Sequence, residues 1–165
     1  MRKKQISPMG IILIILIILG IFYIFSRLFS LNSPQNISNL TNLWIKEVTV
    51  NHDPEAIYKL FCPDGTLVGT VSQSLRKNKE IKGYFEYFAK LPGIKVLDKK
   101  FNIQKITNNV YLNTAFITWT WDSLEEPIIA RMSFIYRDNC IFQLHSSALP
   151  DLNEDSRRIS PVTKF

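Results

Sequence analysis

Hydrophobic positions recur with two different periods along this 165-residue chain. Between residues 43 and 61, and again between 81 and 91, apolar side chains return every three or four positions, which is the spacing of one helix face. Asp53 and Pro54 interrupt the first stretch and can cap a new helix, so this stretch is predicted to be a kinked pair of helices. Pro92 and Gly93 end the second stretch.

β-Strands are predicted where β-branched and aromatic residues gather, at 66–72, 94–107, 110–121, 128–137 and 141–148. Short turns join the last four runs, which favours antiparallel pairing and an α+β fold with helices first and a sheet after them. In the run 110–121 both alternating sets are largely apolar or threonine. Both faces of that strand are therefore predicted to be covered, one by the helices and the other by a candidate partner subunit.

An uncharged apolar stretch at residues 9–25 precedes this domain, and with Leu28 and Phe29 it is long enough to cross a bilayer as a helix. Arg2, Lys3 and Lys4 precede it and only Arg27 follows closely, so the positive-inside rule predicts a single-pass protein with a cytoplasmic N-terminus and a luminal or extracytoplasmic domain. A cleaved signal peptide is the alternative, although no small-x-small cleavage site follows the stretch.

The net charge of +6 is concentrated at the start of the chain. Residues 1–40 carry +4, residues 41–150 carry +2 and residues 151–165 are neutral. Most of the excess therefore reflects membrane topology, and a nucleic-acid partner is not expected. The predicted organisation is a basic cytoplasmic tail, a transmembrane signal-anchor helix, a polar linker, one folded domain and a flexible tail, at residues 1–8, 9–29, 30–42, 43–150 and 151–165.

The chain contains two cysteines and two histidines. Cys62 and Cys140 allow one intramolecular disulfide, but the sequence does not establish that they come within reach of each other. No Cys or His spacing suits a metal, so neither a metal nor another cofactor is expected. Asn36 and Asn39 start glycosylation acceptor patterns, although chance occurrence in an Asn-rich linker is an equal alternative.

Several segments together resemble the nuclear transport factor 2-like superfamily, which includes the SnoaL-like proteins: "GTVS", "IKGYFEYFAKLPG", "NVYLNTAFITWTW", "ARMSFIYR" and "HSSALP". The resemblance covers residues 41–150 and is strongest to the association domain of calcium/calmodulin-dependent protein kinase II. It implies a cone in which a curved antiparallel sheet wraps around helices and encloses a pocket. It also implies homo-oligomers, dimers or larger, that form through the outer sheet face. None of the kinase's catalytic motifs is present.

Relatives often carry a His-His-Ser-Ser motif on the last strand, and Leu144 stands here in place of its first histidine. His145 and Ser147 share one strand face, but no orienting acid is identifiable nearby, so no catalytic residue is assigned. His145 is interpreted as a hydrogen-bonded residue of a pocket or interface, with a purely structural role as the alternative. Arg131 is a candidate carboxylate clamp, as the arginines lining the kinase association domain suggest, or a member of an internal ion pair.

The remaining pocket-wall candidates are Tyr111, Trp119 and Tyr58, any of which can equally be plain core. Together these features predict a membrane-anchored, non-catalytic association module whose cone has room for a small carboxylate ligand. The alternative is a small enzyme of the SnoaL or isomerase type that acts on an apolar ligand. A carboxylate near a tyrosine or near His145 inside the cone would favour the enzyme.

Overall fold

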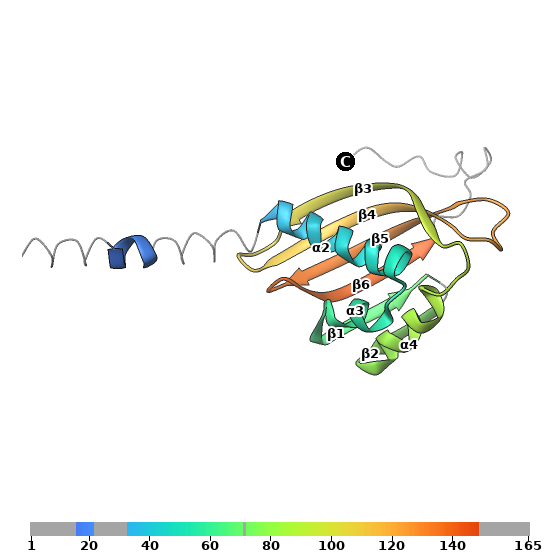
Figure 1. Cartoon of the computed structure of the whole chain (residues 1–165), viewed down its shortest axis with the longest axis horizontal. Coiled ribbons are helices and arrows are strands. Elements are labelled where there is room, and N and C mark those ends of the chain that lie inside the picture. The colour runs from blue at the N-terminus through green and yellow to red at the C-terminus, as the bar shows by residue number, and fades with distance from the viewer. Residues whose placement is uncertain (1–15, 22–32, 71, 149–165) are drawn as a thin grey trace, which may run out of the picture.

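The domain is built on a single six-stranded sheet with the strand order β2-β1-β6-β5-β4-β3 (Figure 1). The computed structural model describes residues 16–21, 33–70 and 72–148. Neighbouring strands pair antiparallel except β1 and β6, which pair parallel. The strands are β1 (Phe61–Gly69), β2 (Ser72–Lys77), β3 (Lys95–Lys105), β4 (Val110–Thr120), β5 (Ile128–Arg137) and β6 (Cys140–Ala148).

The predicted meander from β3 to β6 is confirmed, whereas the first part of the sheet differs from the prediction. The kinked helical pair ends at Lys59, and Phe61, assigned to its apolar face, instead begins β1. A second strand, β2, follows it and leads into the aromatic helix. The predicted strand 94–107 is β3, whose register with β4 shifts between Val96 and Asp98.

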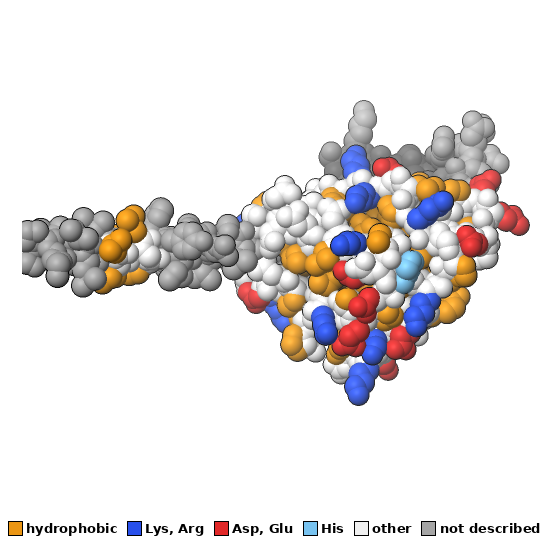
Figure 2. Space-filling model, in the orientation of Figure 1, with side chains coloured by type: hydrophobic (Ala, Val, Ile, Leu, Met, Phe, Trp, Pro, Cys, Tyr) orange, Lys and Arg blue, Asp and Glu red, His pale blue; other side chains and the backbone are white. Residues whose placement is uncertain are grey.

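Four helical segments cover the concave face of the sheet: α2 (Pro34–Lys46), the π-helix η1 (Glu47–Asn51), α3 (Pro54–Lys59) and α4 (Lys79–Phe88). Asp53 caps α3 as predicted, because its carboxylate accepts hydrogen bonds from the amides of Glu55 and Ala56. On the outer side of α3 and α4, acidic and basic side chains are mixed (Figure 2). Lys82 lies 3.0 Å from Glu55 and lowers the pKa of that carboxyl, an exposed pair that adds little stability.

The segment 30–42 was predicted to be a linker, but it is helical from Pro34 onward. α2 begins at Pro34, where the Ser33 hydroxyl accepts a hydrogen bond from the amide of Asn36 at 3.1 Å. Ile37 and Thr41 are buried against the sheet. Of the polar residues that suggested a linker, Ser33 caps the helix, Thr41 is a buried hydrogen-bonding group and Asn39 is exposed. The folded domain therefore begins about ten residues earlier than predicted.

Most of the predicted membrane span, 9–29, lies outside the described residues, as do the predicted tails 1–8 and 151–165. Residues 16–21 are described and are helical. Within the part of the chain that the structure describes, no helix has both the length and the apolar character needed to cross a bilayer.

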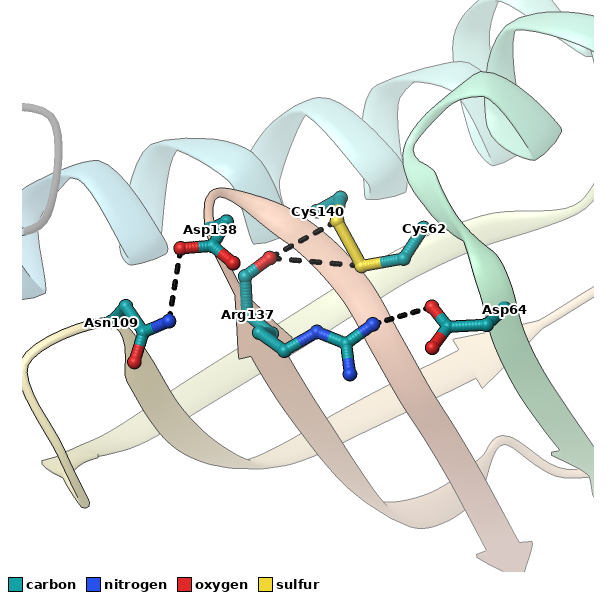
Figure 3. The surroundings of a disulfide bond; sticks show 6 residues. All are labelled: Cys62, Asp64, Asn109, Arg137, Asp138 and Cys140. Carbon is teal, nitrogen blue, oxygen red and sulfur yellow. Dashed lines mark hydrogen bonds and ion pairs between the residues drawn. A yellow bond between two sulfur atoms is a disulfide. The ribbon is translucent and has the colours of Figure 1, made fainter.

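A disulfide joins Cys62 near the start of β1 to Cys140 at the start of β6, with the two Cα atoms 5.0 Å apart (Figure 3). The carbonyl oxygen of Arg137 lies 3.0 Å from Cys140 Sγ and 3.6 Å from Cys62 Sγ; a disulfide has no S–H to donate, so these are close contacts. The Arg137 guanidinium pairs with Asp64 and lowers the pKa of its carboxyl. This cluster fastens β1 to the β5–β6 hairpin.

Candidate functional site

The cone encloses a cavity between the ends of β1 and β6 and the face of α4. Its volume is about 10 Å³, roughly the space that one water molecule needs. A pocket for a small organic ligand is typically some 300 Å³ or more. The lining consists mainly of aromatic and aliphatic side chains, from Trp44, Leu67, Gly69, Thr70, Tyr84, Phe85, Phe88, Trp119, Met132, Leu144 and Ser146.

Aromatic side chains fill the space in which a ligand would otherwise lie. Trp44 of α2 is fully buried and makes edge contacts with Phe85, Trp119 and Phe134, at centroid distances of 5.9, 6.1 and 5.2 Å. Phe88 of α4 closes the same group at 5.5 Å from Trp119. The aromatic stripe of α4 is therefore core, as its helical spacing predicts, and it meets α2 and β4 inside the cone.

Few polar groups reach the cavity. Thr70 and Ser146 hydrogen-bond to each other through their hydroxyls at its edge. Trp44 Nε1 is buried and has no hydrogen-bond partner among the described residues. Among the described residues, the lining contains no carboxylate and no imidazole. With hydroxyl and indole N–H groups only, the described part of the cavity wall offers hydrogen bonds but no side chain that exchanges a proton near neutral pH.

A buried hydrogen-bond network lies under α2, outside the cavity. Thr41 Oγ1 donates to the carbonyl of Ile37 at 2.9 Å, so it accepts from Tyr136 OH at 2.8 Å and from Asn113 Nδ2 at 2.9 Å. Burial raises the pKa of Tyr136 well above its ordinary value, which keeps the phenol neutral and able to donate. The network therefore joins α2 to β4 and β5 and has no acid–base function at neutral pH.

Removing the phenol of this network tests its contribution to stability. Tyr136→Phe is expected to lower the free energy of unfolding by about 1 kcal/mol, because one buried hydrogen bond is lost without an added charge. Urea unfolding followed by tryptophan fluorescence measures the change. Tyr58→Phe is the matched control, because Tyr58 is half-buried and its hydroxyl has no hydrogen bond to the described residues. This variant should lose less stability. An equal loss of stability in both variants would contradict the assignment.

The structure separates the predicted site residues into two groups. His145, Ser147 and Arg131 are exposed on the outer face of the sheet and do not line the cavity. Arg131 pairs in register with Phe116 and Ser147, and its guanidinium carbon lies 5.8 Å from the Phe116 ring centroid. The predicted clamp is therefore directed away from the interior, and the described residues provide no internal ion pair for it.

The other candidates lie inside. Tyr111 and Trp119 are buried core residues, and Trp119 also lines the cavity, whereas Tyr58 packs half-buried from α3. Ser146, which was not predicted as a site residue, is the polar group that β6 directs inward. Its position follows the strand alternation, because Ser146 has the same parity as Leu144, an apolar residue of the core.

A second hollow, of about 670 Å³, is an open surface groove between α2, η1 and β3. Its lining mixes apolar and polar side chains, and among the described residues it includes three lysines, Lys46, Lys95 and Lys99, and one acidic residue, Asp98. Lys99 Nζ donates to Asn42 Oδ1 across the groove. The groove holds no pair of acid and base comparable to a catalytic site, and no cluster of three metal-binding side chains occurs in the described residues.

The two glycosylation candidates both lie on α2. Asn36 Nδ2 donates to Asn139 Oδ1 at 2.8 Å in the β5–β6 turn, so its amide is occupied in the folded domain. Asn39 is exposed, and its side-chain oxygen accepts from Gln35 at 3.2 Å. Of the two, Asn39 is the more accessible acceptor.

No family model matches the sequence, and no curated protein is detectably similar to it. Solved structures do resemble the domain. A protein from Xanthomonas campestris, provisionally named a calcium/calmodulin-dependent protein kinase II association domain, is 25% identical with a TM-score of 0.57. The similarity covers 73% of this chain and 90% of that protein.

Two further structures are similar in fold. A protein from Parabacteroides distasonis, provisionally named a ketosteroid isomerase, has a TM-score of 0.52 at 19% identity, over 74% of this chain and 92% of its own. An uncharacterised protein with a cystatin-like fold from Caulobacter vibrioides has a TM-score of 0.60 at 17% identity. That similarity covers 78% of this chain and 96% of the Caulobacter protein. The similar structures thus include both an association domain and an enzyme by name.

Proposed function

The described domain has the nuclear transport factor 2-like fold, as the sequence resemblance predicts, and on this premise we propose that the chain is a membrane-anchored association module without catalytic activity. The module assembles into dimers or larger homo-oligomers through the outer face of its sheet. The N-terminal apolar segment holds it in a membrane, with the domain on the luminal or extracytoplasmic side.

The single observation that carries this proposal is the filled cone. An enzyme of this fold needs room for a substrate and a group that moves a proton. The cavity here has a volume of about 10 Å³, and the described residues that line it include no carboxylate and no imidazole. The isomerase alternative therefore has less support than the association module. The small carboxylate ligand also has less support, because Arg131 is on the outer face.

The outer sheet face has the composition of an interface. Phe116 is 36% exposed and Ile129 is 46% exposed, and Leu112 and Ile135 are half-buried on the same face. Arg131 lies over the Phe116 ring. Aromatic residues and arginine are enriched where proteins associate, and an apolar sheet face of this kind favours a self-complementary contact between two copies.

The disulfide supports the proposed topology. Disulfides such as Cys62–Cys140 persist in oxidising compartments and are rare in the cytosol. The positive-inside rule, applied to Arg2, Lys3 and Lys4, independently favours the same side of the membrane for the domain. The two arguments rest on different residues and different physical effects, one on redox chemistry and the other on charge.

The oligomeric state tests the proposal. In detergent micelles, the full chain is expected to sediment as a dimer or larger, and Phe116→Asp should shift it toward the monomer, because a carboxylate on the interface would be desolvated without a partner. Tyr87→Asp, at a 64% exposed aromatic of α4, is the matched control and should keep the oligomer. A wild-type chain that stays monomeric at all concentrations would refute the proposed association.

A further inference from the structure

Three segments meet at one end of the domain: the first turn of α2, the β3–β4 turn at residues 106–109 and the β5–β6 turn at residues 138–139. Asn36 Nδ2 donates to Asn139 Oδ1 at 2.8 Å, and Asn109 Nδ2 donates to Asp138 Oδ1 at 3.0 Å. We call this group the proximal end; it lies at the left of the sheet in Figure 1. The hydrogen bonds fix the two turns relative to the start of α2.

The length of chain before α2 limits how far the proximal end can be from a membrane. The predicted span ends at Phe29, and only Ser30, Leu31 and Asn32 separate it from the helix cap Ser33. A chain of this length reaches at most about 14 Å. The headgroup layer on each side of a bilayer is itself about 5 to 8 Å thick. α2 cannot compensate by swinging out, because Ile37 is buried against the domain.

The two ends of the domain differ in surface chemistry. At the proximal end, Ile106 is 57% exposed beside Lys105, and the rest of the β3–β4 turn is uncharged. The β5–β6 turn at this end has one exposed carboxylate, Asp138, which accepts a hydrogen bond from Asn109. At the opposite end, the β4–β5 turn carries three exposed carboxylates, and Figure 2 shows acidic side chains at that tip; they are Asp122, Glu125 and Glu126. A lipid surface accepts an apolar side chain next to a lysine and disfavours clustered carboxylates.

We infer that the proximal end rests on the bilayer surface, with Ile106 and Lys105 against the lipid headgroups, and that the acidic β4–β5 turn points away from the membrane. The inference rests on the proposed membrane anchor. It also constrains the proposed oligomer, because two copies anchored in one membrane must both present this end to it. The two-fold axis of a dimer is then parallel to the bilayer normal.

Fluorescent labels at the two ends test the orientation. Both native cysteines are in the disulfide, so a single introduced cysteine is the only free thiol. We would label Ile106→Cys with an environment-sensitive nitrobenzoxadiazole dye in the full chain, reconstituted in phosphatidylcholine vesicles that contain nitroxide-labelled lipid. Ser123→Cys in the β4–β5 turn is the matched control. β3 has 11 residues and an extended strand of that length spans about 36 Å, which separates the two labels well beyond the range of contact quenching.

The expected result is a loss of emission from the label at position 106 and unchanged emission from the label at position 123. Asn108→Cys, on the same turn, should behave as Ile106→Cys does and covers the case in which the loss of Ile106 disturbs the turn. A chain that does not float with the vesicles overturns both the anchor and the orientation. A chain that floats but shows equal quenching at both ends, or more at position 123, overturns the orientation alone.

Discussion

Trp44→Ala is expected to lower the free energy of unfolding by about 3 to 5 kcal/mol, the range for removal of a fully buried large aromatic side chain. Trp44 touches Phe85, Trp119 and Phe134 from the centre of the cone, so its loss removes contacts with α4, β4 and β5 together. Urea unfolding followed by circular dichroism measures the change without depending on tryptophan emission.

The same variant tests whether Trp44 is what keeps the cone from holding a ligand. Its removal would leave an aromatic-lined cavity, and such dry cavities bind small apolar molecules. Indole is therefore expected to stabilise Trp44→Ala, by about 2.7 kcal/mol at a concentration 100 times its dissociation constant. It should leave the wild-type protein unchanged.

Trp121→Ala provides the control, because Trp121 is only half-buried and contacts Phe88 from the rim, at a centroid distance of 6.5 Å. This variant should lose less stability and gain nothing from indole. If indole stabilised the wild-type protein as strongly as Trp44→Ala, the cone would already contain a usable pocket. That outcome would favour the ligand-binding enzyme over the association module.

Local sequence patterns predicted the elements whose partners are close in the chain. The strands from β3 to β6 are joined by short turns, and strand alternation in β4 separates Tyr111 and Trp119 on the inner face from Phe116 on the outer face. The predicted strand 66–72 covers only the second part of β1, and its first part was missed because the pairing of β1 with β6 is not local. Phe61 lies opposite Ile141, and a parallel pair so distant in sequence has no hairpin signal.

The boundary at the linker shows how composition can mislead. The segment 30–42 is rich in Ser, Asn and Thr, yet Ile37 and Thr41 lie four residues apart on the buried face of α2. The sequence alone does not distinguish a buried, hydrogen-bonded threonine such as Thr41 from a threonine exposed to solvent. A domain that began at residue 43 would lose the network to Tyr136 and Asn113.

For the candidate site, the sequence predicted which residues of β6 share a face, but not which of the two faces is the inner one. The sequence places His145 and Ser147 on one side of β6 and Ser146 on the other, which the structure bears out. Ile141 and Leu144 both pack into the core although they have opposite parity, because the register of β5 and β6 shifts between Ile135 and Tyr136. The apolar residues of β6 therefore did not indicate one inner side. The filling of the cone by Trp44 could not be predicted, because it depends on where α2 crosses the sheet.

Removing the disulfide is expected to destabilise the protein by about 4.5 kcal/mol. The bond closes a loop between residues 78 apart in sequence, and in the chain-entropy account a loop of this size restricts the unfolded chain by that amount. Native pairing across this join is limited, since β1 is irregular between Phe61 and Thr66. The Cys62→Ala/Cys140→Ala double variant should therefore unfold at a lower urea concentration than the oxidised wild type.

Reduction with dithiothreitol separates the effect of losing the disulfide from the effect of replacing the two cysteine side chains. It should lower the stability of the wild type toward that of the double variant and leave the double variant unchanged, because that variant has no bond to reduce. If the reduced and oxidised wild types unfolded at the same urea concentration, the backbone hydrogen bonds between β1 and β6 would be enough to keep the two strands paired without the disulfide.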